Sequence, residues 1–165
     1  MTDTTTRDGQ GDPFHYTPGQ SLGYLVRDTF RAFTRELESR IEEEAGVSIG
    51  HWYFLRALWE EDGLTQRELS RRVGMMEPTT VAAVSGMESK GLVRRDRDPD
   101  DRRKMNVFLT PRARKLKERL LPCARAVNEL AAAGLDEQEV ATLRALLDRV
   151  RRNLGAGAVK EGGDA

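Results

Sequence analysis

Residues 64–110 read LTQRELSRRVGMMEPTTVAAVSGMESKGLVRRDRDPDDRRKMNVFLT. Thr65 and Glu68 have the spacing of a capping box, which predicts a short helix that begins there. Gly74 suits the left-handed conformation that ends a helix. Pro78 suits the first turn of a second helix, because the N–H that proline lacks has no partner at that position. Two helices joined by a short glycine-containing turn are the pattern of a helix-turn-helix.

A β-hairpin is expected directly after these two helices. The segments LVRRDR and KMNVFL flank DPDDR, a turn rich in proline and aspartate. Helix-turn-helix and hairpin together predict a winged helix-turn-helix domain over residues 48–110. Such a domain places one helix in a DNA groove and a basic loop in the next groove.

Long amphipathic helices are predicted on both sides of this domain. Apolar residues recur at spacings of three and four through residues 21–47 and 111–154. These stripes exceed what a small winged domain could bury, which fits a dimerisation region formed by both. Residues 1–20 and 155–165 are expected to be a mobile arm and tail. The predicted fold class is therefore mainly α, with a small β-hairpin wing.

The charge of the chain is unevenly distributed. The 165 residues contain 27 Lys and Arg and 27 Asp and Glu, so the formal net charge is zero. Residues 63–119, however, contain 15 basic and 8 acidic side chains, a net of +7, and the rest of the chain carries −7. A basic half can bind a polyanion even in a neutral protein. An ordinary solvated charged surface is the alternative interpretation.

Several other classes of protein are disfavoured by the sequence. No run of about 18 apolar residues and no signal-peptide core is present, so we expect a cytoplasmic protein without a membrane partner. Cys123 is the single cysteine and has no partner for an internal disulfide; it is interpreted as a packing residue rather than an oxidant sensor. Two histidines and no glycine-rich phosphate loop or metal-ligand cluster argue against an enzyme, a metal site or a cofactor.

The second helix of the motif has a face of unusual composition. At 100° per residue, Val81, Val84 and Met87 fall on one side and are predicted to pack on the preceding helix. The opposite face is small and uncharged, which allows a close approach to a major groove. A helix–helix contact is the alternative. On the DNA interpretation, this face offers a hydroxyl for a base edge or phosphate and methyl groups for thymine; its members are Thr79, Ala82, Ala83 and Gly86.

The hairpin mixes basic and acidic side chains. The acids are expected to pair with some arginines and to fix the shape of the loop. Arg97, or Arg102 and Arg103 beyond the turn, are then candidates to enter a narrow minor groove. A loop of alternating surface charge is the other interpretation. The complete set of candidate DNA-contact residues is Thr65, Gln66, Pro78, Thr79, Thr80, Ala82, Ala83, Gly86, Arg97, Arg102 and Arg103.

From about residue 21 to 154, the chain resembles the MarR family of winged-helix transcriptional regulators. The family's wing commonly reads D-x-x-D-x-R-x-x-x-x-x-L-T, matched here by Asp98, Asp101, Arg103, Leu109 and Thr110. The resemblance implies that Thr79 and Ala82 face the major groove and that Arg102 or Arg103 enters the minor groove. Many members carry a long polar residue where this chain has Ala82.

The resemblance also implies an obligate homodimer on double-stranded DNA. Its two recognition helices would read a pseudo-palindromic operator with half-sites about one helical turn, or about 34 Å, apart. We therefore expect a regulator of transcription, more often a repressor than an activator. The alternative is a winged-helix module that binds proteins and has no sequence-specific DNA binding.

A small-molecule effector is a further implication of the resemblance. Members of the family often bind small aromatic acids or related compounds between the dimer region and the winged domain. Aromatic rings with a few cationic or hydrogen-bonding groups suit an aromatic carboxylate or its thioester. A core position for Trp52 and a half-exposed helix position for His51 are the alternative interpretations. The candidate effector residues are His15, Tyr24, Arg27, His51 and Trp52.

Overall fold

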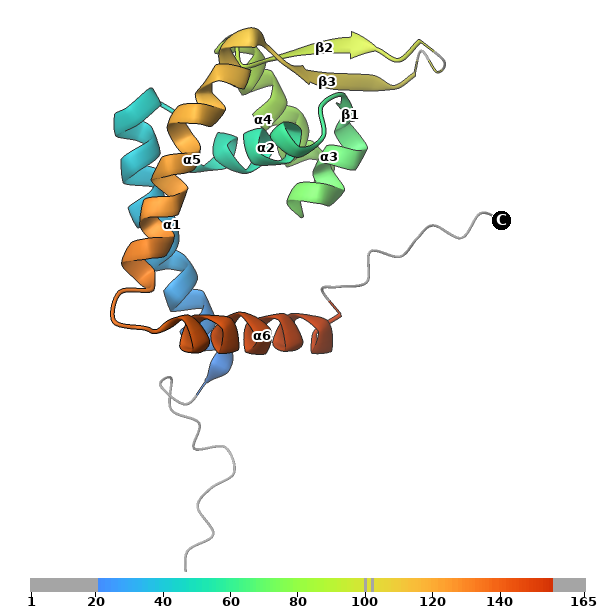
Figure 1. The fold of residues 1–165 in the computed structure, drawn as a ribbon. Coiled ribbons are helices and arrows are strands. Elements are labelled where there is room, and N and C mark those ends of the chain that lie inside the picture. The colour runs from blue at the N-terminus through green and yellow to red at the C-terminus, as the bar shows by residue number, and fades with distance from the viewer. Residues whose placement is uncertain (1–20, 100, 102, 156–165) are drawn as a thin grey trace, which may run out of the picture. The chain divides into compact units, whose positions relative to one another are not determined.

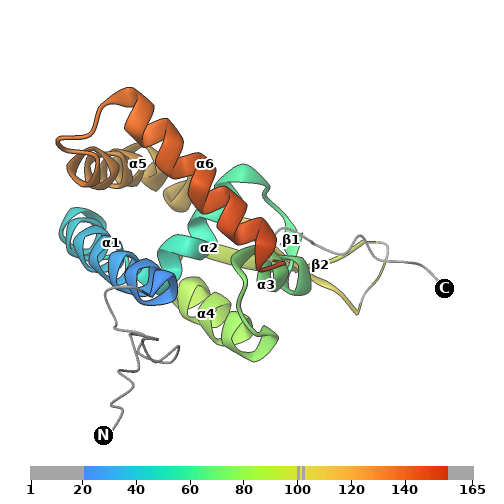
Figure 2. The ribbon, with the colours of Figure 1, turned by 90° about the horizontal axis from the view of Figure 1, so that it is seen from below.

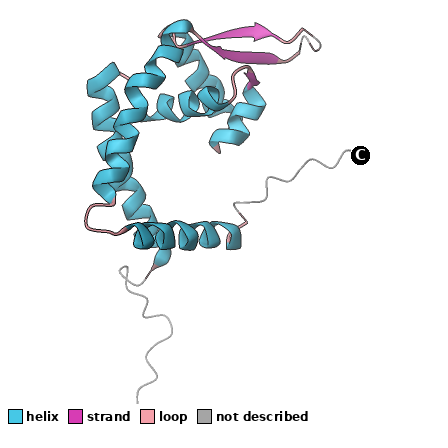
Figure 3. Ribbon diagram, viewed as in Figure 1, coloured by secondary structure: helices cyan, strands magenta, loops and turns pink. Residues whose placement is uncertain are grey.

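The structure is a computed structural model that describes residues 21–99, 101 and 103–155. It is mainly helical with one small antiparallel sheet, which confirms the expected fold class (Figures 1 and 3). The chain divides into two compact units, Met1–Cys123 and Ala124–Ala165. The expected mobile arm and tail lie outside the described residues, apart from Gly155. No helix in the described part of the chain is long and apolar enough to cross a membrane.

Six helices and three short strands make up the described chain. Their bounds, in chain order, are α1 (Leu22–Ala45), α2 (Ile49–Glu60), β1 (Leu64–Thr65), α3 (Gln66–Val73), α4 (Glu77–Ser89), β2 (Val93–Arg97), β3 (Met105–Leu109), α5 (Pro111–Ala131) and α6 (Glu137–Asn153).

Local signals place the ends of these helices where the sequence predicts them. The Ser21 hydroxyl accepts from the backbone N–H of Tyr24 at the start of α1, and Gly46 ends that helix in the left-handed conformation. Thr65 forms the predicted capping box of α3, and Gly74 ends α3 with φ of 72°. These residues satisfy backbone groups that a helix end leaves without partners.

The sheet has the order β1-β3-β2, so the predicted hairpin gains a third strand. Val93 pairs with Leu109 and Arg97 with Met105 across the hairpin. On the other edge of β3, Leu64 pairs with Val107. The strand β1 is only two residues long, and no periodic pattern can announce so short a strand. Its pairing attaches the start of α3 to the base of the wing.

The core of the first unit is built around α2. This helix is apolar on two faces and contacts α1, α3, α4 and β3 (Figure 2). Phe54, Leu55 and Leu58 of α2 are at most 1% exposed. Removing such large apolar side chains from water is the main contribution to stability. Their neighbours in the core are Ile41, Leu69, Val84, Met87, Val93, Val107, Leu109, Leu116 and Leu120.

Two polar side chains join the wing to the helices behind it. Asp62 accepts from the backbone N–H of Leu109 at 2.8 Å and from the guanidinium of Arg114 at 2.7 Å. The Thr110 hydroxyl donates to the carbonyl of Gly91 and accepts from the N–H of Ala113. The side chain of Thr110 therefore both closes the base of the hairpin and caps the first turn of α5.

The second unit contains the last turns of α5 and the whole of α6. Gly134, with φ of 84°, lies in the turn between them. Asp136 and Glu139 form a capping box at the start of α6. None of the described residues of α6 is buried, and the apolar side chains Leu143, Leu146 and Leu147 are about half exposed.

Candidate nucleic-acid interface

The helix-turn-helix is held by a short turn between α3 and α4. Ser70 is 5% exposed, and its hydroxyl donates to the carbonyl of Met75 at 2.5 Å. The N–H of Met75 donates to the carbonyl of Ser70 at 3.0 Å. With Gly74 in the left-handed conformation, these bonds fix the direction in which α4 leaves the turn.

The exposed face of α4 differs from the expected one. Thr80, Val84 and Met87 are fully buried, whereas Val81 is 44% exposed. The prediction that Val81 packs on the preceding helix is therefore wrong. The Thr80 hydroxyl bonds to the carbonyl of Met76, which satisfies it in the core and removes Thr80 from the accessible candidates. At 100° per residue, the exposed face is turned by about a quarter of a revolution from the predicted one.

The small residues of α4 divide between this surface and the protein interior. Pro78, Thr79 and Ala82 are exposed, while Ala83 is half-buried. A Cβ built on Gly86 would lie 3.4 Å from Nε2 of His51 on α2. Gly86 therefore lies against α2, so its lack of a side chain serves the packing of α4 on α2, not an approach to DNA.

The N-terminus of α3 offers fewer free hydrogen-bonding groups for a DNA contact than its sequence indicates. The Thr65 hydroxyl donates to a Glu68 carboxylate oxygen at 2.6 Å and accepts from the Glu68 N–H at 3.2 Å. The hydroxyl of Thr65, and then its backbone N–H at 2.8 Å, donate to the Glu68 carboxylate and lower the pKa of Glu68. Thr65 therefore has no free hydroxyl hydrogen for a phosphate. Gln66 is half-buried, and its amide nitrogen has no hydrogen-bond partner among the described residues.

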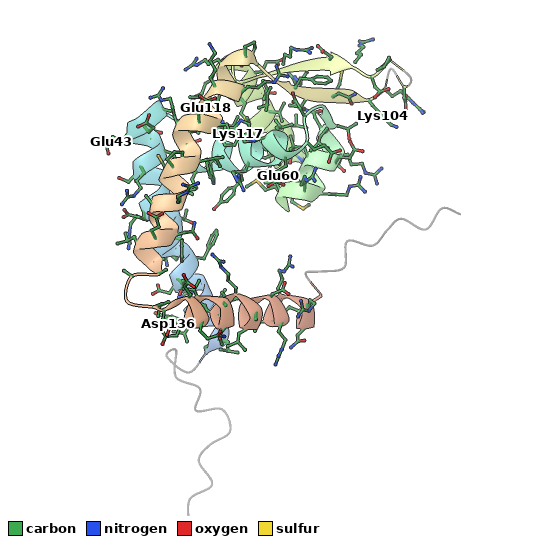
Figure 4. All side chains as sticks on the ribbon, viewed as in Figure 1. Glu43, Glu60, Lys104, Lys117, Glu118 and Asp136 are labelled. Atoms are coloured by element: carbon green, nitrogen blue, oxygen red, sulfur yellow. The ribbon has the colours of Figure 1, made fainter. Side chains whose placement is uncertain are left out.

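The acids of the wing fix the shape of its tip, as the sequence predicts. Asp98 accepts from the N–H of Asp101 at 3.0 Å and from the side-chain amide of Asn106 at 2.9 Å. Asp101 accepts from the backbone N–H and the guanidinium of Arg103, and these bonds lower the pKa of Asp101. Lys104 projects from the same end of the hairpin (Figure 4).

The candidate arginines of the wing have different surroundings. Arg103 is 91% exposed in its side chain although it is paired with Asp101. Arg97 ends β2, is exposed, and has no ion pair with any residue that the structure describes. Arg102 lies outside the described residues. Arg97 and Arg103 are therefore exposed cations of the described wing, together with Arg94 and Lys104.

Arg95 attaches the wing to α4. Its Nε donates to the Glu88 carboxylate at 3.0 Å, and one terminal nitrogen lies 3.4 Å from the Ser85 hydroxyl. The hydrogen bond from Arg95 lowers the pKa of Glu88. Arg95 therefore positions strand β2 of the wing against α4.

The candidate effector residues fall into separate groups. The Arg27 guanidinium lies 4.6 Å from the centre of the Tyr24 ring on α1. Trp52 is 4% exposed and packs edge-to-face on Trp59 at 5.7 Å, so it is a core residue, the alternative position, rather than an open binding surface. Among the described residues, no hydrogen bond, ion pair or ring contact joins these two groups. His15 lies outside the described residues.

A hollow of about 520 Å³ lies elsewhere in the first unit. It is lined by the C-terminal end of α1 and the first turns of α5, and none of the candidate effector residues lines it. Its residues are Ala45, Pro111, Arg112, Lys115, Leu116 and Arg119.

Comparisons with known proteins agree with this geometry. The model of the MarR family matches residues 45–104. The HTH-type transcriptional regulator TtmR of Methylorubrum extorquens is 30% identical over 142 residues, which cover 86% of this chain and 69% of TtmR. The chain belongs to the MarR family.

Two further similarities extend the comparison to most of the chain. The HTH-type transcriptional repressor NicR of Pseudomonas putida is 27% identical over 89% of this chain and 92% of its own. A MarR transcriptional regulator from Methanosarcina mazei superposes with a TM-score of 0.73 at 29% identity, covering 82% of this chain and 97% of the other. This MarR-family protein is a DNA-binding transcriptional regulator.

Sequence reasoning missed three residues on the surface of this MarR-family protein. Val81 and Ser85 lie on the exposed face of α4, and Arg95 holds the wing against it. One signal was present: Thr80, Val84 and Met87 form a stripe at spacings of four and three. Threonine suits the buried stripe because its hydroxyl can bond to the carbonyl four residues before it.

Proposed function

We propose that this chain acts as a homodimer on a pseudo-palindromic operator, with α4 in the major groove and the wing over the adjacent minor groove. The observation that carries the proposal is that Arg95 holds the wing, with its exposed Arg97 and Arg103, against α4, on which Thr79, Val81 and Ala82 are exposed. Thr79 is exposed, and its hydroxyl is proposed to hydrogen-bond to a base edge or a phosphate. Arg102 remains a candidate for the minor groove on the resemblance alone.

Exposed apolar stripes support the homodimer. Leu22, Leu25 and Phe30 on α1 are between 48% and 63% exposed. Leu143 and Leu147 on α6 are similarly open. Side chains of this kind are normally covered, and a second copy of the chain covers them by symmetry.

The wing is tested with Arg103→Ala in a gel-shift titration of a duplex that the full-length protein selects from random-sequence DNA. Removing an arginine from the minor groove is expected to weaken binding by about 1–3 kcal/mol and to lower the salt dependence of the affinity. Arg35→Ala removes the same charge from the face of α1 opposite its apolar stripe and serves as the control. Unchanged binding by Arg103→Ala would refute the role of this arginine in the wing.

Salt dependence also tests the mode of binding. Neutralised phosphates release counterions, so the logarithm of the affinity falls linearly with the logarithm of the salt concentration. A protein-binding module with a largely apolar interface would show little dependence. This module is not the favoured function, because the relatives of this chain are regulators of transcription.

We further propose that the chain is a repressor released by a small aromatic acid or a related thioester. The name of NicR supports repression. Tyr24, Arg27 and His51 stay candidates for the effector site. The hollow at α5 is a second location, because Arg112, Lys115 and Arg119 beside apolar Leu116 match the chemistry of an aromatic carboxylate.

A panel of aromatic acids in the gel-shift titration tests release. Compounds that dissociate the complex are then titrated against two charge-removing variants, Arg27→Ala and Lys115→Ala. Loss of response in one variant identifies the site that is used. If no aromatic acid or thioester changes the affinity for DNA, the effector proposal is wrong.

A further inference from the structure

The exposed face of α4 is apolar where a recognition helix meets the bases. Val81 is 44% exposed and Ala82 is exposed beside it. Met76, directly before the helix, is 75% exposed, and Pro78 follows it at the first turn. A solvated helix face normally carries charged side chains. This face therefore presents methyl and methylene groups to the ligand that covers it.

The polar groups of α4 are already engaged within the protein. The Thr80 hydroxyl bonds to the carbonyl of Met76, and the Ser89 hydroxyl bonds to the carbonyl of Gly86. Glu88 is held by Arg95, whose terminal nitrogen also reaches the Ser85 hydroxyl. Glu77, one turn before Val81, pairs with Arg67 at 3.7 Å, and among the described hydroxyl groups of the exposed face that of Thr79 has no such contact. Direct hydrogen-bonded readout of several bases therefore lacks side chains to perform it.

We propose that Val81, with Ala82 beside it, determines sequence specificity by contacting the C5-methyl groups of thymine in the major groove. This inference rests on the proposed docking of α4 on DNA. The thymine methyl is the apolar group that the bases present in the major groove, and an apolar side chain reads it by burial. Val81 is the larger contact because its two γ-methyl groups project beyond the Cβ atoms of Ala82.

Uracil tests the proposal because it differs from thymine by this methyl group alone. The duplex selected by the full-length protein is resynthesised with deoxyuridine at each thymine in turn, and affinities are measured by gel-shift titration. One buried methyl group corresponds to about a fourfold change in affinity, so we expect about fourfold weaker binding for one half-site and about fifteenfold for both. Deoxyuridine in the flanking sequence is the control.

The variant Val81→Ala assigns the effect to its residue. Alanine favours the helix, and removing the exposed methyl groups of Val81 leaves no buried cavity, so the variant retains the fold. It is expected to bind the thymine duplex more weakly and to lose most of the discrimination between thymine and uracil at one position in each half-site. Val81→Thr, which keeps one γ-methyl group, should keep part of it.

The possible results separate the two proposals. If the wild-type protein selects a duplex but binds its uracil form equally well, methyl readout is refuted while DNA binding stands. If discrimination is undiminished in Val81→Ala at every thymine, the assignment to Val81 is wrong. If the wild-type protein enriches no sequence, the proposed operator binding fails, and the inference fails with it.

Discussion

At the scale of single residues, His51 is the polar side chain on which the position of α4 depends. Its ring lies against Gly86, and its buried Nδ1 atom has no hydrogen-bond partner among the described residues. Burial, and then the positive charge of Lys90, lower the pKa of His51 below its ordinary value of 6.5. The ring is therefore kept neutral beside α4, the helix proposed to enter the major groove.

The titration of His51 predicts how stability depends on pH. In the unfolded chain this histidine binds a proton near pH 6.5. In the folded protein its pKa is lower, so protonation favours the unfolded state. The free energy of unfolding should therefore fall as the pH decreases from 7.5 to 5.5. Urea unfolding at fixed protein concentration measures it.

The variant His51→Gln is the comparison for this prediction. Glutamine does not titrate, so the variant should lose less stability than the wild type over the same interval. Equal losses in both proteins would show that His51 does not carry the pH dependence. The interval lies above the titration of ordinary carboxylates, so these contribute little.

At the scale of secondary-structure elements, the glycines at the ends of elements differ in what surrounds them. Gly63 has φ of 80°, and a Cβ there would lie 2.6 Å from the ring of Phe108. Gly74 has φ of 72°, with nothing within 4 Å of the same position. Both positions require the left-handed conformation, but only at Gly63 would a Cβ atom also collide with a neighbouring side chain.

Gly63→Ala should therefore destabilise the protein more than Gly74→Ala. Gly74→Ala is the matched control, which carries the left-handed strain alone, about 1 kcal/mol. Gly63→Ala adds the displacement of Phe108, whose ring also stacks on the Arg94 guanidinium at 4.7 Å. Chemical denaturation of both variants measures the difference. Equal losses would mean that Phe108 moves aside at no cost.

The elements were largely predictable because most of their boundaries depend on local chemistry. Thr65, Gly74, Pro78 and Asp136 each act on backbone groups within a few residues of themselves. The two-residue strand β1 was not predictable, because its partner lies about 40 residues further along the chain.

At the scale of the whole molecule, internal ion pairs reduce the charge that is available to DNA. In the basic region, Arg72 pairs with Glu61 and Arg114 with Asp62, two acids that lie outside residues 63–119. Arg119 pairs with Glu44 at 2.7 Å. A net charge of +7 over residues 63–119 therefore overstates the phosphate contacts, and a shallower salt dependence than this charge indicates is expected.

The proposed homodimer predicts the effect of charge on the apolar stripes. Phe30→Asp on α1 or Leu147→Asp on α6 should give a particle with the mass of one chain, 18.6 kDa, because dimerisation would bury an unpaired carboxylate. Ala145→Asp places the same charge on the opposite side of α6 and should leave the dimer intact. Sedimentation equilibrium gives the masses. Dimers of both stripe variants would refute these interfaces.

The sequence by itself determined the winged helix-turn-helix, its helix ends and the charged tip of the wing, because caps, turns and short loops depend on neighbouring residues. Only the tertiary structure decided which side of α4 is exposed. The packing of Thr80 in the core and of Gly86 on His51 sets the rotation of that helix and turns Val81 outward. Such contacts join segments far apart in the chain, and helical periodicity alone cannot choose between two stripes of similar composition.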